Sequence, residues 1–238
     1  ELCYDLEPFE YPHPDGIAVK RLTLVKAMMD CDKIITVSKL KTHGMMMYTG
    51  AVKVMFGAVP GMMKAEYHFK MPDIGDFSNM LVDICTYTKP VLSIIDGVTG
   101  MEGDGPTAGT PVNSGVILAS ESPYEADYVG SYLMGINPSD VPTIKRCIER
   151  GLLSGELNDI EIAGSLGGLR KKYKIPDTKK ISFTAKYLPE WLEKFLDRNL
   201  SPKPVFSQKF VAQPENLSTI SKELSRLLDQ PVDIECVL

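Results

Sequence analysis

The sequence predicts an α/β domain with a largely parallel sheet, helices on both faces and a mainly helical C-terminal extension. Short apolar, β-branched segments alternate along the chain with segments whose apolar residues recur at helical spacing. This alternation is typical of a parallel sheet covered by helices. The chain has 238 residues, 44% of them apolar and 24% charged, as in ordinary globular proteins. We expect the α/β domain over residues 1–169 and a basic extension over residues 170–238.

The first half of the domain is expected to contain three helices and one strand. Apolar residues at helical spacing predict the helices, and a β-branched run predicts the strand. The expected helices cover residues 18–29, 48–59 and 76–87, and the expected strand covers residues 33–37. Pro60-Gly61 ends the second helix, because proline and glycine interrupt helical structure.

The second half is expected to contain three strands and two helices. The expected strands cover residues 91–96, 115–119 and 159–163, and the expected helices cover residues 123–134 and 138–151. A loop with five glycines, residues 97–111, separates the first two of these strands. After Gly168 the sequence becomes rich in lysine and is interrupted by prolines, with helices expected over residues 188–200 and 217–228.

Cysteine spacing, hydropathy and the N-terminus limit the function classes. The five cysteines are at least 28 residues apart, so the chain has neither a CxxC pair nor a secreted disulfide framework. No apolar run reaches about 18 residues, and no signal peptide is evident. We therefore expect a cytoplasmic protein without a membrane partner. The chain begins at Glu1 rather than at methionine, which suggests that further N-terminal elements of a longer protein are missing.

The net charge of −5 conceals a strongly basic segment. Residues 33–71 contain six lysines and two histidines against one acid, Glu66, among many glycines, methionines and aromatic residues. A basic segment of this composition can line a pocket. Nucleic-acid binding is not expected, because the pI is about 5.3, arginines are few and no nucleic-acid-binding motif occurs.

The expected binding site lies at the end of the first strand. If this strand continues, Ile35 and Val37 fill the core and Lys39, Lys41 and His43 follow on the same side, because strand side chains alternate. Ligands of open α/β sheets bind at the carboxyl ends of strands. Clustered lysines suit a carboxylate or a phosphate. We therefore expect a small anionic ligand.

Other side chains are expected at the same site. Lys53 lies in an apolar, glycine-rich segment, where an unpaired ammonium is costly. The glycine-rich loop offers backbone N–H groups and carboxylates. The expected ligand-binding residues are Lys39, Lys41, Lys53, His68, Gly103 and Gly105, and the expected proton-transfer residues are His43, Asp96 and Glu102. Structural roles are the alternative: solvated lysines at a strand end, a packed core histidine and an aspartate that caps a turn.

These motifs resemble the family called domain of unknown function 362 (DUF362), which is often associated with iron–sulfur clusters. The resemblance rests on Lys39-Leu-Lys-Thr-His43, Gly50-Ala-Val-Lys53, Phe56-Gly57, Pro60-Gly61, Asp96-Gly97, Met101-Glu-Gly103, Gly105-Pro106-Thr107 and Ala126-Asp127. It implies a fold and a site, possible redox chemistry in relatives, and no defined reaction. Two features depart from the family: Thr36-Val37-Ser38 replaces an expected Asn-x-Pro, and residues 204–238 contain only Cys236 instead of CxxCxxC clusters. No iron–sulfur cluster is expected from this chain alone, since a cluster needs about four cysteines.

Two other function classes remain open, and the sequence does not decide whether the chain is an enzyme or which cofactor it uses. One is a non-catalytic partner subunit of an electron-transfer assembly that docks through a methionine-rich surface, since seven of the 12 methionines lie between Met45 and Met71. The other is a metal-dependent enzyme using His43, His68 and Asp96, although the spacing of the histidines matches no standard ligand motif.

Overall fold

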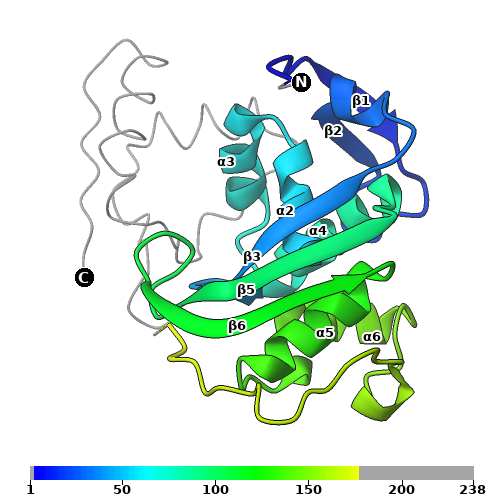
Figure 1. Ribbon diagram of the computed structural model, residues 1–238. Coiled ribbons are helices and arrows are strands. Elements are labelled where there is room, and N and C mark those ends of the chain that lie inside the picture. Colours follow the sequence, from blue (N-terminus) through cyan, green and yellow to red (C-terminus); the bar gives the residue numbers. More distant parts are fainter. Residues whose placement is uncertain (1–2, 177–238) are drawn as a thin grey trace, which may run out of the picture. The chain divides into compact units, whose positions relative to one another are not determined.

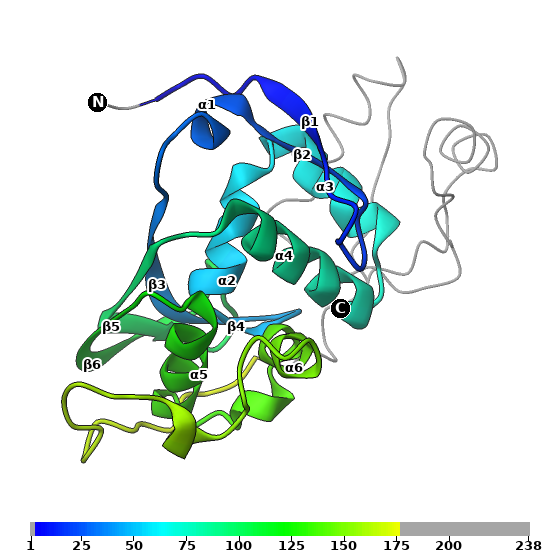
Figure 2. The ribbon, with the colours of Figure 1, turned by 90° about the vertical axis from the view of Figure 1, so that its right-hand side faces the viewer.

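The centre of the structure is a four-stranded mixed sheet with the strand order β4-β3-β5-β6. Figure 1 labels β3, β5 and β6, and Figure 2 labels β4. The computed structural model describes residues 3–176, which lie within one compact unit, Glu1–Pro176. β3 (Ile35–His43) and β5 (Leu92–Glu102) are parallel. β4 (Met47–Thr49) and β6 (Thr110–Ser120) are antiparallel to β3 and β5, respectively. The sequence pattern predicts a largely parallel sheet, but only one of the three pairings among the described strands of this sheet is parallel.

The glycine-rich segment after Asp96 explains this difference. We expected a loop over residues 97–111, but β5 continues through Gly97 and Gly100 to Glu102, and β6 begins at Thr110. The two strands form a long hairpin that pairs Glu102 with Thr110. A strand with two glycines resembles a loop in sequence, because glycine is depleted from ordinary strands.

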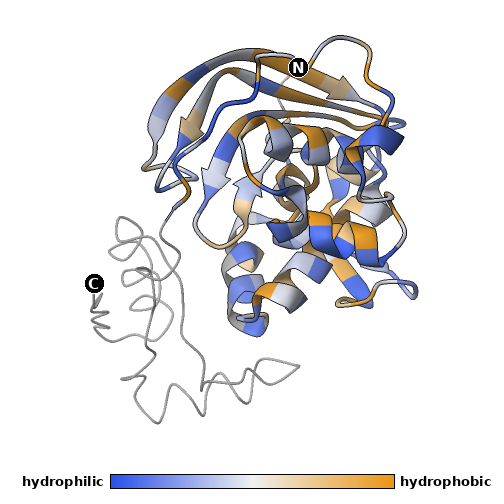
Figure 3. Ribbon diagram, turned by 90° about the horizontal axis from the view of Figure 1, so that it is seen from below, coloured by the Kyte–Doolittle hydropathy of each residue, from blue (hydrophilic) through white to orange (hydrophobic). Residues whose placement is uncertain are grey.

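In the part of the chain that the structure describes, helices cover one face of the sheet rather than both. The sheet and the helices occupy opposite sides in Figures 2 and 3. The helices on the covered face are α2 (Ala51–Val54), α4 (Ile74–Thr88), α5 (Pro123–Leu133) and α6 (Pro142–Glu149). On the other face Ile35, Val37 and Ile117 are exposed by 57%, 67% and 66%. The expectation that Ile35 and Val37 fill the core was therefore wrong; the buried side of β3 carries Thr36, Leu40 and Thr42.

The N-terminal part forms a separate two-stranded sheet of β1 (Pro8–Pro12) and β2 (Arg21–Val25), followed by the short helix α1 (Lys26–Met29). The helix predicted over residues 18–29 was wrong for most of its length. Leu22 and Leu24 are both fully buried, which is the two-residue period of a strand. The carboxylate of buried Asp83 in α4 accepts hydrogen bonds from the backbone N–H groups of residues 17–19 and so holds this segment.

The remaining elements agree with the sequence to different extents. α4 and α5 confirm the helices predicted over residues 76–87 and 123–134. Residues 48–59 instead form the end of β4, α2 and the 3₁₀ helix η1 (Met55–Ala58), and residues 138–151 form η2 (Pro138–Asp140) and α6. α3 (Gly61–Lys70) was not expected, and residues 159–163 form no strand, because η3 (Leu157–Asp159) leads into irregular chain.

The helices expected over residues 188–200 and 217–228 lie outside the described residues. Within the described unit, the chain beyond residue 169 still packs on the domain. Tyr173 is buried, and its backbone N–H donates to the Met134 carbonyl at 2.9 Å. None of the helices in residues 3–176 combines the length and the apolar character needed to cross a bilayer.

Candidate functional site

Three elements bring basic side chains together at the carboxyl end of β3. Lys41 and His43 come from β3, Lys53 from α2, and Lys64 and His68 from α3. We call these five residues the basic cluster. Their proximity is evident from their mutual electrostatic effects: the charges of Lys53, His68 and Lys41 all lower the pKa of His43, after the larger effect of burial.

Lys53 is a buried cation of the cluster without a counter-charge among the described residues. Burial, together with the smaller effects of the charges of Lys41 and Lys64, lowers the pKa of its ammonium to about 8. Within residues 3–176 the ammonium has no hydrogen bond or ion pair, and no carboxylate acts on its pKa. An unpaired charge removed from water is costly, so this position favours an anion supplied from outside.

Backbone hydrogen bonds engage one ring nitrogen of His43. Its Nδ1 atom accepts hydrogen bonds from the backbone N–H groups of Met45 and Met46, both at 3.2 Å. Because burial holds the pKa of His43 well below 6.5, the ring is neutral at pH 7. With Nδ1 acting as an acceptor, the proton of the neutral ring is assigned to Nε2. His43 therefore offers an Nε2–H donor.

His68 is fixed by aromatic rings. It stacks on Phe77 with a centroid distance of 4.4 Å, and it meets Phe56 edge to face at 5.8 Å. Burial lowers its pKa to about 4, and the charge of Lys53 adds to the effect. His68 is thus also neutral at pH 7 and is held in one orientation beside the charged group of Lys53.

A buried carboxylate on α5 holds the helix that carries Lys53. Asp127 accepts hydrogen bonds from the backbone N–H groups of Ala51 (2.5 Å) and Val52 (3.0 Å) and from the Tyr48 hydroxyl (3.3 Å). Burial raises the pKa of Asp127 to about 7, although these three hydrogen bonds oppose the shift. A Cβ atom on Gly50 would lie 2.2 Å from both Asp127 Oδ1 and Tyr48 Oη, so only glycine fits between the capping carboxylate and the helix.

Sequence reasoning missed the role of Asp127. An acidic residue within the apolar stretch Ala126-Asp-Tyr-Val129 of a helix is a signal of a buried, partnered carboxylate. Lys64 was also missed as a cluster member, since its spacing from Lys53 has no meaning until the turn at Pro60 is known.

The structure does not bring Lys39 and Asp96 to the cluster. They form an ion pair with each other at 2.5 Å, and both side chains are substantially exposed. This hydrogen bond, together with the one from the Val98 N–H, lowers the pKa of Asp96. A register irregularity between Lys39 and Lys41 pairs Lys39 with Asp96 but Lys41 with Met101, so the two lysines occupy different surroundings.

Glu102 and two glycines of the hairpin loop form hydrogen bonds with other residues of the chain. The Glu102 carboxylate accepts from the backbone N–H of Lys174 at 2.8 Å. The N–H groups of Gly103 and Gly105 donate to the carbonyls of Lys174 and Gly103, both at 2.7 Å. The loop also packs closely on β3: a Cβ atom on Gly105 would lie 2.1 Å from the Thr42 carbonyl oxygen. The Lys41 ammonium donates to the Pro106 carbonyl at 3.2 Å, which joins this loop to the cluster.

The described residues contain no grouping of three or more histidine, cysteine, aspartate or glutamate side chains that could hold a metal ion. Asp96 is paired with Lys39, so it does not join His43 and His68 as a third metal ligand. The methionines of the basic segment belong largely to the core. Met46 and Met55 are buried, and Met45, Met63 and Met71 pack partly against them.

Comparison with known proteins places this site within a family. The family model "Domain of unknown function (DUF362)" matches residues 3–132, which include the whole basic cluster and Asp127. Thylakoid-associated protein sll1697 of Synechocystis sp. is 37% identical over 131 residues. The match covers 55% of this chain and 41% of that protein, so the chain spans less than half of the relative's length. No solved structure matches the chain. Since the family model covers more than half of its residues, the chain belongs to the DUF362 family.

Proposed function

We propose that this domain binds a small anion, a carboxylate or a phosphate, in the basic cluster. The observation that carries the proposal is the Lys53 ammonium, which is mostly buried among other basic groups and has no carboxylate beside it in the described chain. An anionic oxygen would supply the missing counter-charge. Hydrogen bonds between an ammonium and such an oxygen are stronger than those between neutral groups.

The five residues have complementary roles in this proposal. Lys53 and Lys41 supply positive charge, and the neutral rings of His43 and His68 supply directed hydrogen bonds. His43 donates from Nε2, because its Nδ1 is occupied by backbone donors. An anion also favours the protonated form of every neighbouring base. Its binding is therefore accompanied by proton uptake wherever Lys53 or the histidines are partly deprotonated.

We also propose that the domain acts in the cytoplasm. The Synechocystis relative carries the name thylakoid-associated, which describes that protein. A link to redox chemistry rests on the resemblance to iron–sulfur-associated relatives and would require a partner that carries the cluster.

The test is calorimetric titration with inorganic phosphate and with malonate, supported by thermal unfolding. We expect at least one of the two anions to bind the wild type and to raise its melting temperature. Lys53→Met and Lys41→Gln should lose this response, whereas Lys145→Gln, which changes an exposed lysine of α6, should retain it. Equal responses of Lys53→Met and the wild type, or no binding of either anion, would refute the proposal.

A further inference from the structure

The amino-terminal half of β3 has an open edge, well separated along the strand from the basic cluster. Among the described strands, β4 pairs only with Lys41–His43 of β3, so the segment Ile35–Lys39 has a partner only on the β5 side. The Ile34 carbonyl accepts a hydrogen bond from the Val91 N–H at 2.9 Å. Because backbone groups alternate in direction along a strand, those of Ile35 and Val37 point away from β5.

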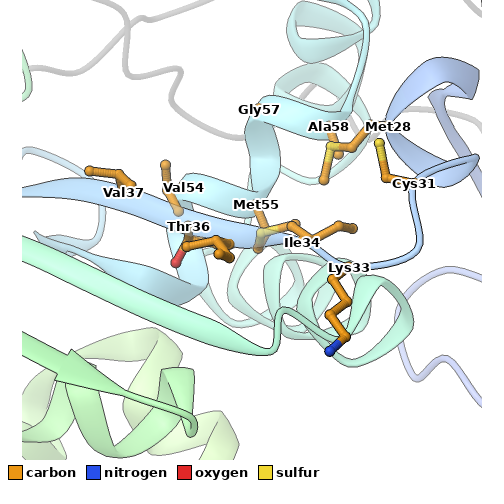
Figure 4. Close-up of a pocket in the computed structure, with 11 residues that line it drawn as sticks. Met28, Cys31, Lys33, Ile34, Thr36, Val37, Val54, Met55, Gly57 and Ala58 are labelled. Atoms are coloured by element: carbon orange, nitrogen blue, oxygen red, sulfur yellow. The ribbon is translucent and has the colours of Figure 1, made fainter.

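A groove of about 360 Å³ runs along this edge (Figure 4). β3 and the turn before it form one wall, and α2, η1 and the end of α1 form the other. The lining residues are Met28, Cys31, Lys33, Ile34, Ile35, Thr36, Val37, Val54, Met55, Gly57 and Ala58. Most of them are apolar; Lys33 is the one charged side chain among them, and its ammonium points away from the sulfur atoms of Met28 and Cys31 in Figure 4. The volume falls within the range of ligand pockets.

Polar groups in this region lack partners. The Thr36 side chain is 4% exposed, and its hydroxyl oxygen has no hydrogen-bond partner among the described residues. Ile35 and Val37, next to it, are more than half exposed. Unpaired backbone groups at strand spacing, flanked by exposed β-branched side chains, are complementary to another extended chain.

We infer that this groove binds an extended segment of a partner polypeptide, which adds as a strand to the free edge of β3. The backbone groups of Ile35 and Val37 would bond to the segment, as in strand addition to a sheet edge. Alternate apolar side chains of the segment would contact Met28, Met55 and Ala58. Lys33 is the charged residue among those that line the groove, no acid lines it, and its ammonium points away from Met28 and Cys31, so the segment carries an acidic residue at its end near this ammonium, outside the apolar part of the groove.

The test uses a seven-residue peptide, acetyl-Asp-Val-Thr-Val-Thr-Val-Asp-amide, and the full chain. Binding is measured by calorimetry, and amide hydrogen exchange is followed by NMR. In the free protein the Ile35 and Val37 amides should exchange faster than those of Thr36 and Ser38, whose backbone groups face β5. Saturating peptide should slow exchange at Ile35 and Val37 at least tenfold. Absence of binding, or binding without this protection, would overturn the inference.

Two matched changes separate strand addition from unspecific adhesion. Val37→Pro removes an N–H group that faces the groove and does not belong to the β5 ladder, so it should weaken peptide binding by about tenfold while leaving the melting temperature nearly unchanged. Val37→Thr keeps the N–H and should bind nearly as well as the wild type. If the proline variant does not fold, two peptides replace it, each N-methylated at alternate residues so that one of its two hydrogen-bonding edges is blocked. If both methylated peptides bind as tightly as the parent peptide, strand addition is contradicted.

Discussion

Lys53 illustrates how a residue placed for binding can lower the stability of the unliganded domain. Its pKa is lowered to about 8 because the charged form is buried beside other cations. A depressed lysine pKa means that the folded state binds the proton less tightly than the unfolded state does. The cost is present at neutral pH and is relieved as the pH rises from about 8 towards 10.5.

We therefore predict that Lys53→Met stabilises the anion-free protein by about 2 kcal/mol at pH 7, while anion binding is lost. The methionine keeps the apolar length of the side chain and removes the buried charge. Chemical denaturation at pH 7 and pH 10 measures the effect. The advantage of the variant over the wild type should shrink at the higher pH, and a variant less stable than the wild type at pH 7 would contradict the account.

His68 has the same kind of cost in a lower pH window. Its pKa is lowered to about 4, so between pH 6.5 and 4 the unfolded state binds a proton that the folded state does not. The free energy of unfolding therefore falls with acid, and Asp127, with a pKa raised to about 7, gives the opposite slope over the same range. A comparison of variants separates the two effects.

We predict that His68→Phe, which can preserve stacking on Phe77, reduces the acid sensitivity of the domain. From pH 6.5 to pH 4 the wild type should lose about 2 kcal/mol relative to the variant. Urea denaturation across this range is the measurement. A difference between the two proteins that stays constant with pH would show that His68 is not held in its neutral form by the fold.

At the scale of the elements, α2 is too short to be stable by itself. It has four residues, whereas isolated helices shorter than about 12 residues are marginal. Its first N–H groups are satisfied by Asp127 from α5, and Gly50 makes room for that carboxylate. The position of Lys53 therefore depends on a residue distant in sequence.

Replacement of the cap tests this dependence. Asp127→Ala should lower the free energy of unfolding at pH 7 by about 2–4 kcal/mol, since two buried backbone donors lose their acceptor. Affinity for phosphate should also fall, because Lys53 is no longer held in place. The control is Ser139→Ala, which changes an exposed residue of the 3₁₀ helix η2. A small loss of stability with unchanged affinity would argue against the positioning role of Asp127.

Elements with a strong local pattern could be predicted, and those set by tertiary contacts could not. α4 and α5 have long apolar stripes, and side chains of Asp73 and Ser122 cap their first turns. β2 was mistaken for a helix because Leu22 and Leu24 lie within a longer apolar series that also fits a helical face. The side of β3 that faces the core could not be deduced, because apolar Ile35 and Val37 lie on the uncovered face while threonines face the helices.

At the scale of the whole molecule, the sequence predicts that three of the basic residues lie together, and their role in binding stays a prediction. The rule that ligands bind at the carboxyl ends of strands predicts Lys41 and His43, and the cost of an unpaired buried charge predicts Lys53. The structure brings these three residues close to one another. Asp96 and Glu102 were grouped with them because the hairpin was read as a loop. In the structure both carboxylates have other partners within the chain.

Among the described residues, the basic cluster and the open edge of β3 are two separate features of the domain. Lys53, Lys64 and His68 of the basic cluster belong to α2 and α3, and none of the five cluster residues lines the groove beside Ile35 and Val37. Anion binding and strand addition can therefore be tested independently on this chain.

The most direct test of the central claim is the pKa of the Lys53 ammonium, measured by NMR on ¹⁵N-labelled lysine side chains and assigned with Lys53→Met. Without anion, we predict a value of about 8. With saturating phosphate or malonate, whichever binds, the value should rise towards the ordinary lysine value of about 10.4, because a bound anion stabilises the charged form. A pKa of Lys53 that is the same with and without bound anion would show that the anion does not occupy the basic cluster.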